Sequence, residues 1–123
     1  MSCVFCAIAG GEIPVARIAE DEAGLAFPDA NPKSPGHLLV IPHQHVADLG
    51  DGADAYVAVA PLVARVSRLV SERLGADGVN LVVNSGESAG QEVFHLHVHV
   101  IPRYGRSEPP ADAQAAVDAL SGA

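Results

Sequence analysis

Three histidines alternate with apolar residues in the run His95-Leu96-His97-Val98-His99. In a β-strand, residues two apart share a face and lie about 6.5–7 Å from each other, so three imidazoles would line one face. Three of the six histidines fall within these five residues, a clustering that chance explains poorly. Neutral imidazole is a good nucleophile near pH 7 and a good leaving group afterwards, so the run favours nucleophilic catalysis. A triple-histidine metal site and a purely structural role are the alternatives.

A glycine-rich loop comes immediately before the histidines. Residues 85–91 read Ser-Gly-Glu-Ser-Ala-Gly-Gln. Gly86 and Gly90 would let the backbone approach a ligand closely and offer N–H groups to an anion. Many glycine-rich loops are only turns, but the position of this one directly before the histidine run favours an anion-binding loop.

Cys3 and Cys6 form a CxxC pair at the start of the chain. We do not expect a structural disulfide, because we expect the protein in a reducing cytoplasm. Two cysteines at this spacing supply half of a tetrahedral zinc site, which two histidines would complete. His43 and His45, which follow the third predicted strand, are candidates. A redox motif and a pair of thiols without a role remain open.

The composition points to one globular domain that binds a small ligand. A chain of 123 residues with 49% hydrophobic residues is long enough for one core and too short for two. The net charge of −8 and the seven Lys and Arg residues argue against a nucleic acid polymer or a membrane surface as partner. We find no secretory signal and no apolar run of the ~18–20 residues that span a membrane. We therefore expect a cytoplasmic protein.

Apolar periodicity and turn residues predict five strands and one main helix. The order of these elements is not a repeated β-α-β, so we expect an α+β fold built on a five-stranded antiparallel sheet with short flanking helices. The expected elements are a helix or turn over residues 3–9, strands over 15–20, 24–28, 37–41, 79–84 and 94–101, a main helix from about 54 to 74, and a terminal helix over 111–120.

The segment from Gly90 to Ile101, GQEVFHLHVHVI, resembles the signature of the histidine-triad (HIT) family. Residues 11–14, 25–29, 34–42 and 82–84 are also similar to family segments, so the resemblance covers about residues 3 to 104. It implies a HIT domain over residues 1–106, with a tail or helix over 107–123. It also implies a homodimer in which two sheets pair into one. The CxxC places the chain among the bacterial CxxC-containing type, nearest the purine nucleoside phosphoramidase branch.

The resemblance also implies roles for individual residues. His97 would attack the α-phosphorus of a purine nucleotide such as an AMP derivative, forming a nucleotidyl-histidine, with its tautomer fixed by a backbone carbonyl. His99 would donate to a phosphate oxygen or the bridging atom. The expected substrate-binding residues are Phe5, Ile8 and Phe27 for the base, Asp29 for the ribose, Asn84 for the phosphate or leaving-group region, and Gly90, Gln91, Glu92 and Val93 in the loop before the triad.

In CxxC-bearing relatives the family holds a structural zinc ion. Carried over to this chain, the resemblance implies Cys3, Cys6, His45 and His95 as ligands and no catalytic metal. It also implies that His37 lies near the triad, where it could hydrogen-bond to it. We expect His43 to be exposed.

The match has departures that bear on the leaving group. Glu92 stands where the phosphoramidase branch has Ser and the dinucleoside polyphosphate branch has Thr. In the base and ribose pocket, Pro28 replaces a polar residue. The chain lacks the Trp-Pro-Pro-Gly ending of the phosphoramidase branch. We expect a nucleotide phosphoramidase or hydrolase. The alternatives are a dinucleoside polyphosphate hydrolase, a non-catalytic nucleotide-binding regulatory module, and a metal enzyme that uses the three histidines as ligands.

Overall fold

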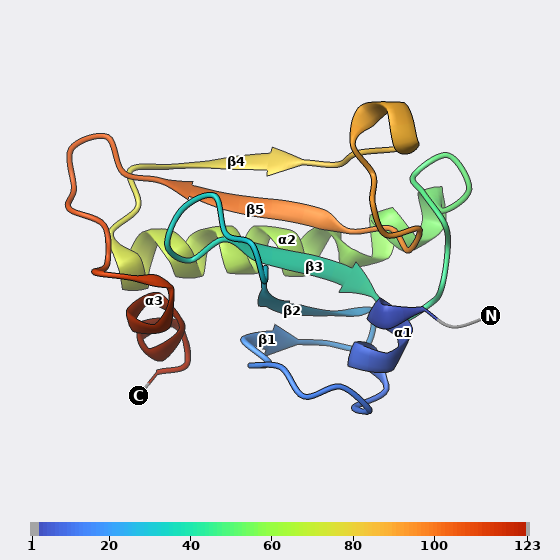
Figure 1. Cartoon of the computed structure of the whole chain (residues 1–123), viewed down its shortest axis with the longest axis horizontal. Helices are drawn as coiled ribbons and strands as arrows, with labels where there is room; N and C mark the ends of the chain where they lie inside the picture. Colours follow the sequence, from blue (N-terminus) through green and yellow to red (C-terminus); the bar gives the residue numbers. More distant parts are fainter. Residues whose placement is uncertain (1–2, 123) are drawn as a thin grey trace.

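The computed structural model describes residues 3–122 and contains one five-stranded sheet in the order β1-β2-β3-β5-β4 (Figure 1). Every neighbouring pair of strands is antiparallel, which confirms the predicted α+β fold class. The elements are α1 (Val4–Ala9), β1 (Ala19–Glu20), β2 (Gly24–Pro28), β3 (Leu38–Pro42), α2 (Ala53–Leu74), β4 (Gly78–Val82), the 3₁₀ helix η1 (Glu87–Ala89), β5 (Val98–Arg103) and α3 (Ala113–Leu120).

The first and last strands differ from their predicted ranges. Strand β1 has two residues instead of the six expected over 15–20, because the segment before it packs against α1, where Arg17 Nη1 donates to the Ile8 carbonyl at 3.1 Å. Strand β5 begins at Val98, not Phe94, and continues through Pro102. Since β3 pairs only as far as Val100, a proline at position 102 lies beyond that ladder and is tolerated.

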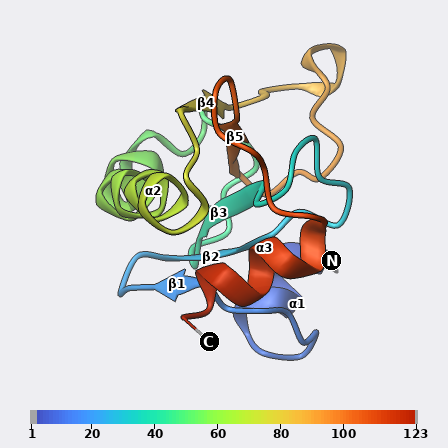
Figure 2. The same ribbon diagram turned by 90° about the vertical axis from the view of Figure 1, so that its left-hand side faces the viewer.

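The two faces of the sheet carry separate apolar clusters, because alternate strand residues point to opposite sides. Helix α2 covers one face and α1 packs on the other (Figure 2). On the α2 face, the cluster joins Val59, Leu62, Val66 and Val70 to Ala26, Val40, Val98 and Val100. On the α1 face, Phe5 and Ile8 pack with Leu25, Phe27, Leu39 and Ile41. His99 alternates with Val98 and Val100, so its side chain lies on the α1 face.

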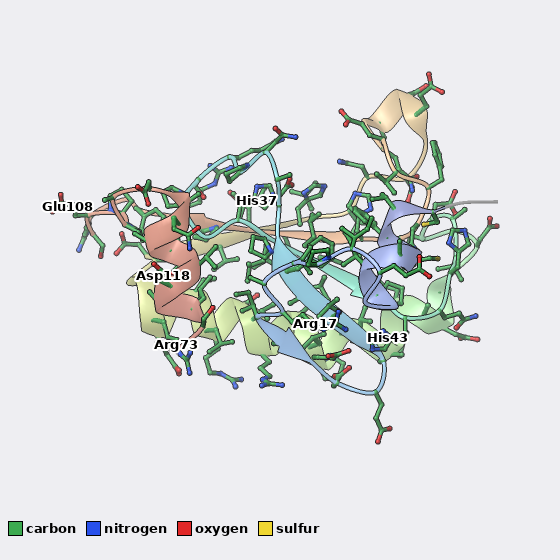
Figure 3. The ribbon with its side chains drawn as sticks, turned by 60° about the horizontal axis from the view of Figure 1, so that its bottom comes forward. Arg17, His37, His43, Arg73, Glu108 and Asp118 are labelled. Atoms are coloured by element: carbon green, nitrogen blue, oxygen red, sulfur yellow. The ribbon has the colours of Figure 1, made fainter. Side chains whose placement is uncertain are left out.

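The C-terminal segment forms a helix that packs beside α2. Ala116 and Leu120 of α3 are buried in the same cluster as α2, and Arg73 Nη1 donates to the Leu120 carbonyl at 2.8 Å. Figure 3 labels Arg73 and Asp118 on these two neighbouring helices. The Asp112 side chain caps the start of α3 by accepting from the Ala115 N–H at 2.8 Å. Within residues 3–122, none of the helices combines the length and apolarity needed to cross a membrane.

Candidate functional site

A cavity of about 660 Å³ opens on the α1 face of the sheet. This volume lies in the range of small-molecule binding sites. Most of the residues predicted to bind substrate line it together with the second and third histidines of the triad. These are Phe5, Ile8, Phe27, Asp29, Asn84, Gly90, Glu92, Val93, His97 and His99.

The geometry of His97 leaves one ring nitrogen free for chemistry. Its Nδ1 lies 2.8 Å from the carbonyl oxygen of His95. A carbonyl can only accept, so in the neutral ring Nδ1 carries the proton and Nε2 keeps its lone pair. The ring is 7% exposed and packs edge-on against Phe5, with centroids 5.1 Å apart. Tautomer and orientation are therefore both fixed by short contacts from neighbouring backbone and side chain.

A chain of hydrogen bonds fixes the tautomer of His99 in the same way. The Lys33 backbone N–H donates to His37 Nδ1 at 3.0 Å, which places the proton of the neutral His37 ring on Nε2. His37 Nε2 lies 3.0 Å from His99 Nδ1 and donates to it. His99 must then carry its own proton on Nε2. The sequence expectation that His37 lies near the triad is confirmed, and the Nε2–H group of His99 is the one available to a ligand.

Burial keeps the imidazole rings of His37 and His99 neutral near pH 7. Burial lowers the pKa of His37, whose side chain is fully buried. Burial, followed by the neighbouring His97 and His37 rings, lowers the pKa of His99 to about 4. A neutral His99 can accept from His37 on Nδ1 and donate from Nε2 at once, which a protonated ring cannot do.

The same rings and Asp29 lie close enough to raise a metal site as a competing explanation. Asp29 Oδ2 is 3.4 Å from His37 Nε2 and 3.7 Å from His99 Nδ1. A metal on His37 Nε2 would leave the proton of the neutral ring on Nδ1, where it would face the Lys33 N–H. Two donors cannot share that 3.0 Å contact, so the geometry favours the hydrogen-bond chain over a metal ion here.

The loop before the histidines holds itself together through Gln91. The Gln91 side chain is 2% exposed; its Oε1 accepts from the Gly86 N–H at 2.8 Å and its Nε2 donates to the Ala47 carbonyl at 2.6 Å. The Gln91 side chain, which the sequence placed among the substrate-binding residues, is thus occupied within the loop and is not among the residues that line the cavity.

The glycines of this loop also differ from expectation. Gly86 and Gly90 have φ of +93° and +96°, which favours glycine at both positions. The Gly86 N–H is taken by Gln91, and the Gly90 N–H donates to the Glu87 carbonyl at 3.0 Å. These two N–H groups are therefore not free to bind an anion as predicted. Gly90 contributes shape instead, since it lines the cavity beside Asn84.

The four residues expected to hold zinc come together at the N-terminal end of α1. Their ligand atoms all lie within 4.8 Å of one another. His95 Nδ1 is 3.5 Å from the sulfur of Cys3, 3.5 Å from that of Cys6 and 3.2 Å from His45 Nδ1, and Cys6 Sγ is 3.3 Å from His45 Nδ1. Bonds of about 2.0–2.1 Å to nitrogen and 2.3 Å to sulfur give a zinc tetrahedron with edges of roughly 3.3–3.8 Å.

The second ring nitrogen of His95 prepares it as a ligand. His95 Nε2 lies 2.9 Å from the Pro42 carbonyl oxygen and must donate to it, so Nδ1 keeps its lone pair for a metal. Burial lowers the pKa of His95, which favours the neutral ring that metal binding requires. The donor set, its spacing and this outer hydrogen bond all fit a closed Cys₂His₂ zinc site.

Two features differ from the sequence expectations, one at the site and one away from it. The Lys33 backbone N–H was not foreseen, because a main-chain contact across a loop leaves no mark in residue type. His43 is half-buried, not exposed: its Nε2 lies 3.2 Å from the Asp21 carbonyl oxygen. His43 and Arg17 lie together near β1, well apart from His37 (Figure 3).

Comparisons with known proteins agree with this geometry. A family model described as the HIT domain matches residues 10–106. "Protein hit" of Bacillus subtilis is 42% identical over 111 residues, covering 87% of this chain and 74% of that protein. An adenosine 5′-monophosphoramidase of Schizosaccharomyces pombe is 41% identical over 104 residues, covering 84% and 75%. An adenylylsulfatase of Arabidopsis thaliana is 42% identical over 105 residues, covering 85% of this chain and 53% of that protein.

A solved structure extends the likeness to the whole chain. The zinc-bound histidine triad family protein of Mycobacterium smegmatis has a TM-score of 0.88 and 40% identity, covering 99% of this chain and 92% of that one. Because the HIT domain model spans most of the residues and relatives above 40% identity cover more than four fifths of them, this chain belongs to the histidine-triad (HIT) family.

Proposed function

We propose that the protein is a nucleotide hydrolase that cleaves a bond to the α-phosphorus of a purine nucleotide, with a phosphorus–nitrogen bond as its first choice. The observation that carries the proposal is the 2.8 Å contact from His97 Nδ1 to the His95 carbonyl. It leaves the Nε2 lone pair on a ring that lines a nucleotide-sized cavity. Two relatives of this chain are named for reactions on AMP-type substrates, which supports the substrate class.

The lining of the cavity suggests how such a nucleotide would lie. Phe5, Ile8 and Phe27 form its apolar part and would receive the base. Asp29 would accept from the ribose hydroxyls through its carboxylate. The phosphate would then lie between His97 and the loop that carries Gly90, within reach of the Nε2–H group of His99.

The reaction would proceed in two displacements at phosphorus. In the first, His97 Nε2 forms a bond to phosphorus as the bond to the leaving nitrogen breaks; that nitrogen keeps the electron pair and takes a proton from solvent. In the second, a water adds to phosphorus, the bond to His97 breaks with its pair returning to Nε2, and the water releases a proton. His99 donates a hydrogen bond to a phosphate oxygen in both steps and stabilises the developing charge.

The zinc ion that the Cys3, Cys6, His45 and His95 group would hold supplies structure in this proposal. It would tie α1 to the segment that follows β3 and to the start of the histidine run. Since all four positions would be filled by side chains, no position is left for a substrate or water. The chemistry at phosphorus therefore rests on the histidines.

We also propose that the protein is a cytoplasmic homodimer whose subunits join at β4. This strand is at the edge of the sheet, and Leu81 on it is 54% exposed. An unpaired edge with exposed apolar residues favours pairing with a second sheet. Sedimentation of the purified protein would measure its mass, and a monomer at micromolar concentration would contradict the dimer.

The main test replaces His97 with alanine and follows hydrolysis of adenosine 5′-phosphoramidate. We expect turnover to fall by roughly a thousandfold or more, the scale typical of a lost nucleophile. AMP binding, measured by calorimetry, should remain. His43→Ala is the matched control, because His43 does not line the cavity and should leave turnover unchanged.

The outcomes separate the alternatives. Turnover of His97→Ala within tenfold of the unchanged protein would contradict the role of the nucleophile. Faster cleavage of diadenosine tetraphosphate than of the phosphoramidate would assign the protein to dinucleoside polyphosphate hydrolysis. If AMP binds but neither compound is cleaved, the protein is a nucleotide-binding module and not an enzyme.

A further inference from the structure

A second cavity of about 650 Å³ adjoins the 660 Å³ cavity that His97 and His99 line, which we call the nucleotide cavity. Its lining consists of the metal-binding group's Cys3, Cys6 and His45 together with Val4, Glu92, Val93 and Phe94. Val4, Glu92 and Val93 also line the nucleotide cavity, so the two hollows meet across these three residues. A ligand bound at His97 could therefore extend past Glu92 toward the metal-binding group.

The walls of this second cavity are largely apolar and open. Val4 and Phe94 are 45% and 47% exposed. Both line the cavity together with Glu92, Val4 from α1 and Phe94 from the segment before the histidines. Apolar side chains left exposed at the rim of a cavity are typical of a ligand-binding surface.

The charge of the cavity decides what kind of ligand it suits. Among the described residues that line it, Glu92 is the one carboxylate and there is no Lys or Arg. A zinc ion held by two thiolates and two neutral imidazoles would add no net charge. A sulfate or polyphosphate leaving group would meet only a negative charge here, whereas an ammonium group would be attracted to Glu92.

We propose that this cavity is the leaving-group subsite, and that Phe94 and Glu92 select an apolar primary amine over an anionic leaving group. The inference rests on the proposed function. When the phosphorus–nitrogen bond breaks, the pair stays on nitrogen, which takes one proton from solvent to become the amine and a second to become the ammonium ion. Its alkyl chain lies against Val4 and Phe94, and the ammonium lies beside Glu92.

The test uses adenosine 5′-phosphoramidates of ethylamine, butylamine and hexylamine, with unsubstituted phosphoramidate and adenosine 5′-phosphosulfate for comparison. Each methylene group that becomes buried should raise kcat/KM by about fourfold. Phe94→Ser should flatten this dependence on chain length. Val57→Ser is its control, since Val57 is 68% exposed on α2 and lines neither cavity.

Glu92→Gln tests the charge. It should shift the ratio of kcat/KM for the sulfate over the butylamine substrate by about fivefold toward the sulfate, the scale of one exposed charge pair. Glu108→Gln is its control, because Glu108 is exposed and lines neither cavity. Circular dichroism and zinc content would establish that each variant is folded.

The results separate failure of this inference from failure of the proposed function. The subsite would be overturned, and the proposed function would stand, if the unsubstituted phosphoramidate is cleaved but kcat/KM does not change with the length of the alkyl chain. This result would have to hold in both the unchanged protein and Phe94→Ser. An unchanged sulfate-to-amine ratio in Glu92→Gln would overturn the selection by charge. No cleavage of any phosphoramidate by the unchanged protein would overturn the proposed function and the subsite with it.

Discussion

Acid should destabilise this protein through His99, and the size of the effect follows from its surroundings. His99 is 15% exposed on its side chain, and burial with the nearby His97 and His37 rings lowers its pKa from 6.5 to about 4. In the unfolded chain the ring titrates near 6.5. Between these two values the unfolded state binds a proton that the folded state does not, so stability falls as pH decreases. The loss begins near pH 6.5 and is complete below pH 4.

The magnitude can be worked out from these two pKa values. At pH 7.5 the ring is neutral in both states and contributes no difference. At pH 5 the unfolded state holds nearly one proton more, and integration from pH 7.5 to pH 5 gives a loss of about 2 kcal/mol in the free energy of unfolding. His37 and His95, whose pKa values are also lowered by burial, should add losses of the same sign.

Urea unfolding of the unchanged protein and of His99→Asn at pH 7.5 and pH 5 isolates the share of His99. Asparagine keeps an acceptor for His37 and does not titrate. Acid also weakens metal binding, but both proteins carry the same four ligands, so this effect cancels in the difference between them. The gap in free energy between the two proteins should change by about 2 kcal/mol with pH. Parallel profiles would refute the reasoning.

Three further measurements test other parts of the structure. Freshly purified protein should contain about one zinc ion per chain, lost in Cys3→Ser; metal-free fresh protein would contradict the site. His37→Phe should lower kcat by roughly two- to tenfold with little change in KM, because one hydrogen bond to His99 is lost. An unchanged kcat would show that the hydrogen bonds from Lys33 through His37 to His99 do not contribute to turnover. Gly24→Ala should cost about 1–3 kcal/mol of stability, since its Cβ would lie 2.3 Å from the Ile41 carbonyl oxygen, whereas Gly78→Ala should be tolerated.

The sequence predicted the sheet and the grouping of the site better than the details of strand ends and loops. Short continuous apolar runs identified β2 and β3 to within a residue, because both faces of those strands are buried. The short β1 was overestimated, since the contact of Arg17 with α1 is set by tertiary packing that local pattern does not report.

The site shows the same division between residue type and backbone detail. The family resemblance grouped Cys3, Cys6, His45 and His95, which indeed lie together although 92 positions separate the first from the last. It could not foresee that Gln91 would turn inward and occupy the Gly86 N–H. That outcome depends on which backbone groups the folded loop leaves unpaired, and every residue except proline carries the same backbone N–H and C=O groups, so residue type does not report it.

If the proposed function holds, the six-residue helix α1 has a consequence for how long a nucleotide would stay bound. An isolated helix shorter than about 12–15 residues is barely stable in water, so α1 depends on its contacts. Phe5 holds it to the cavity, and Cys3 and Cys6 hold it to the metal-binding group. Opening of this one segment would uncover the apolar wall of the nucleotide cavity and break the metal site in a single event. A bound metal ion would then lengthen the residence time of the product without taking part in its formation.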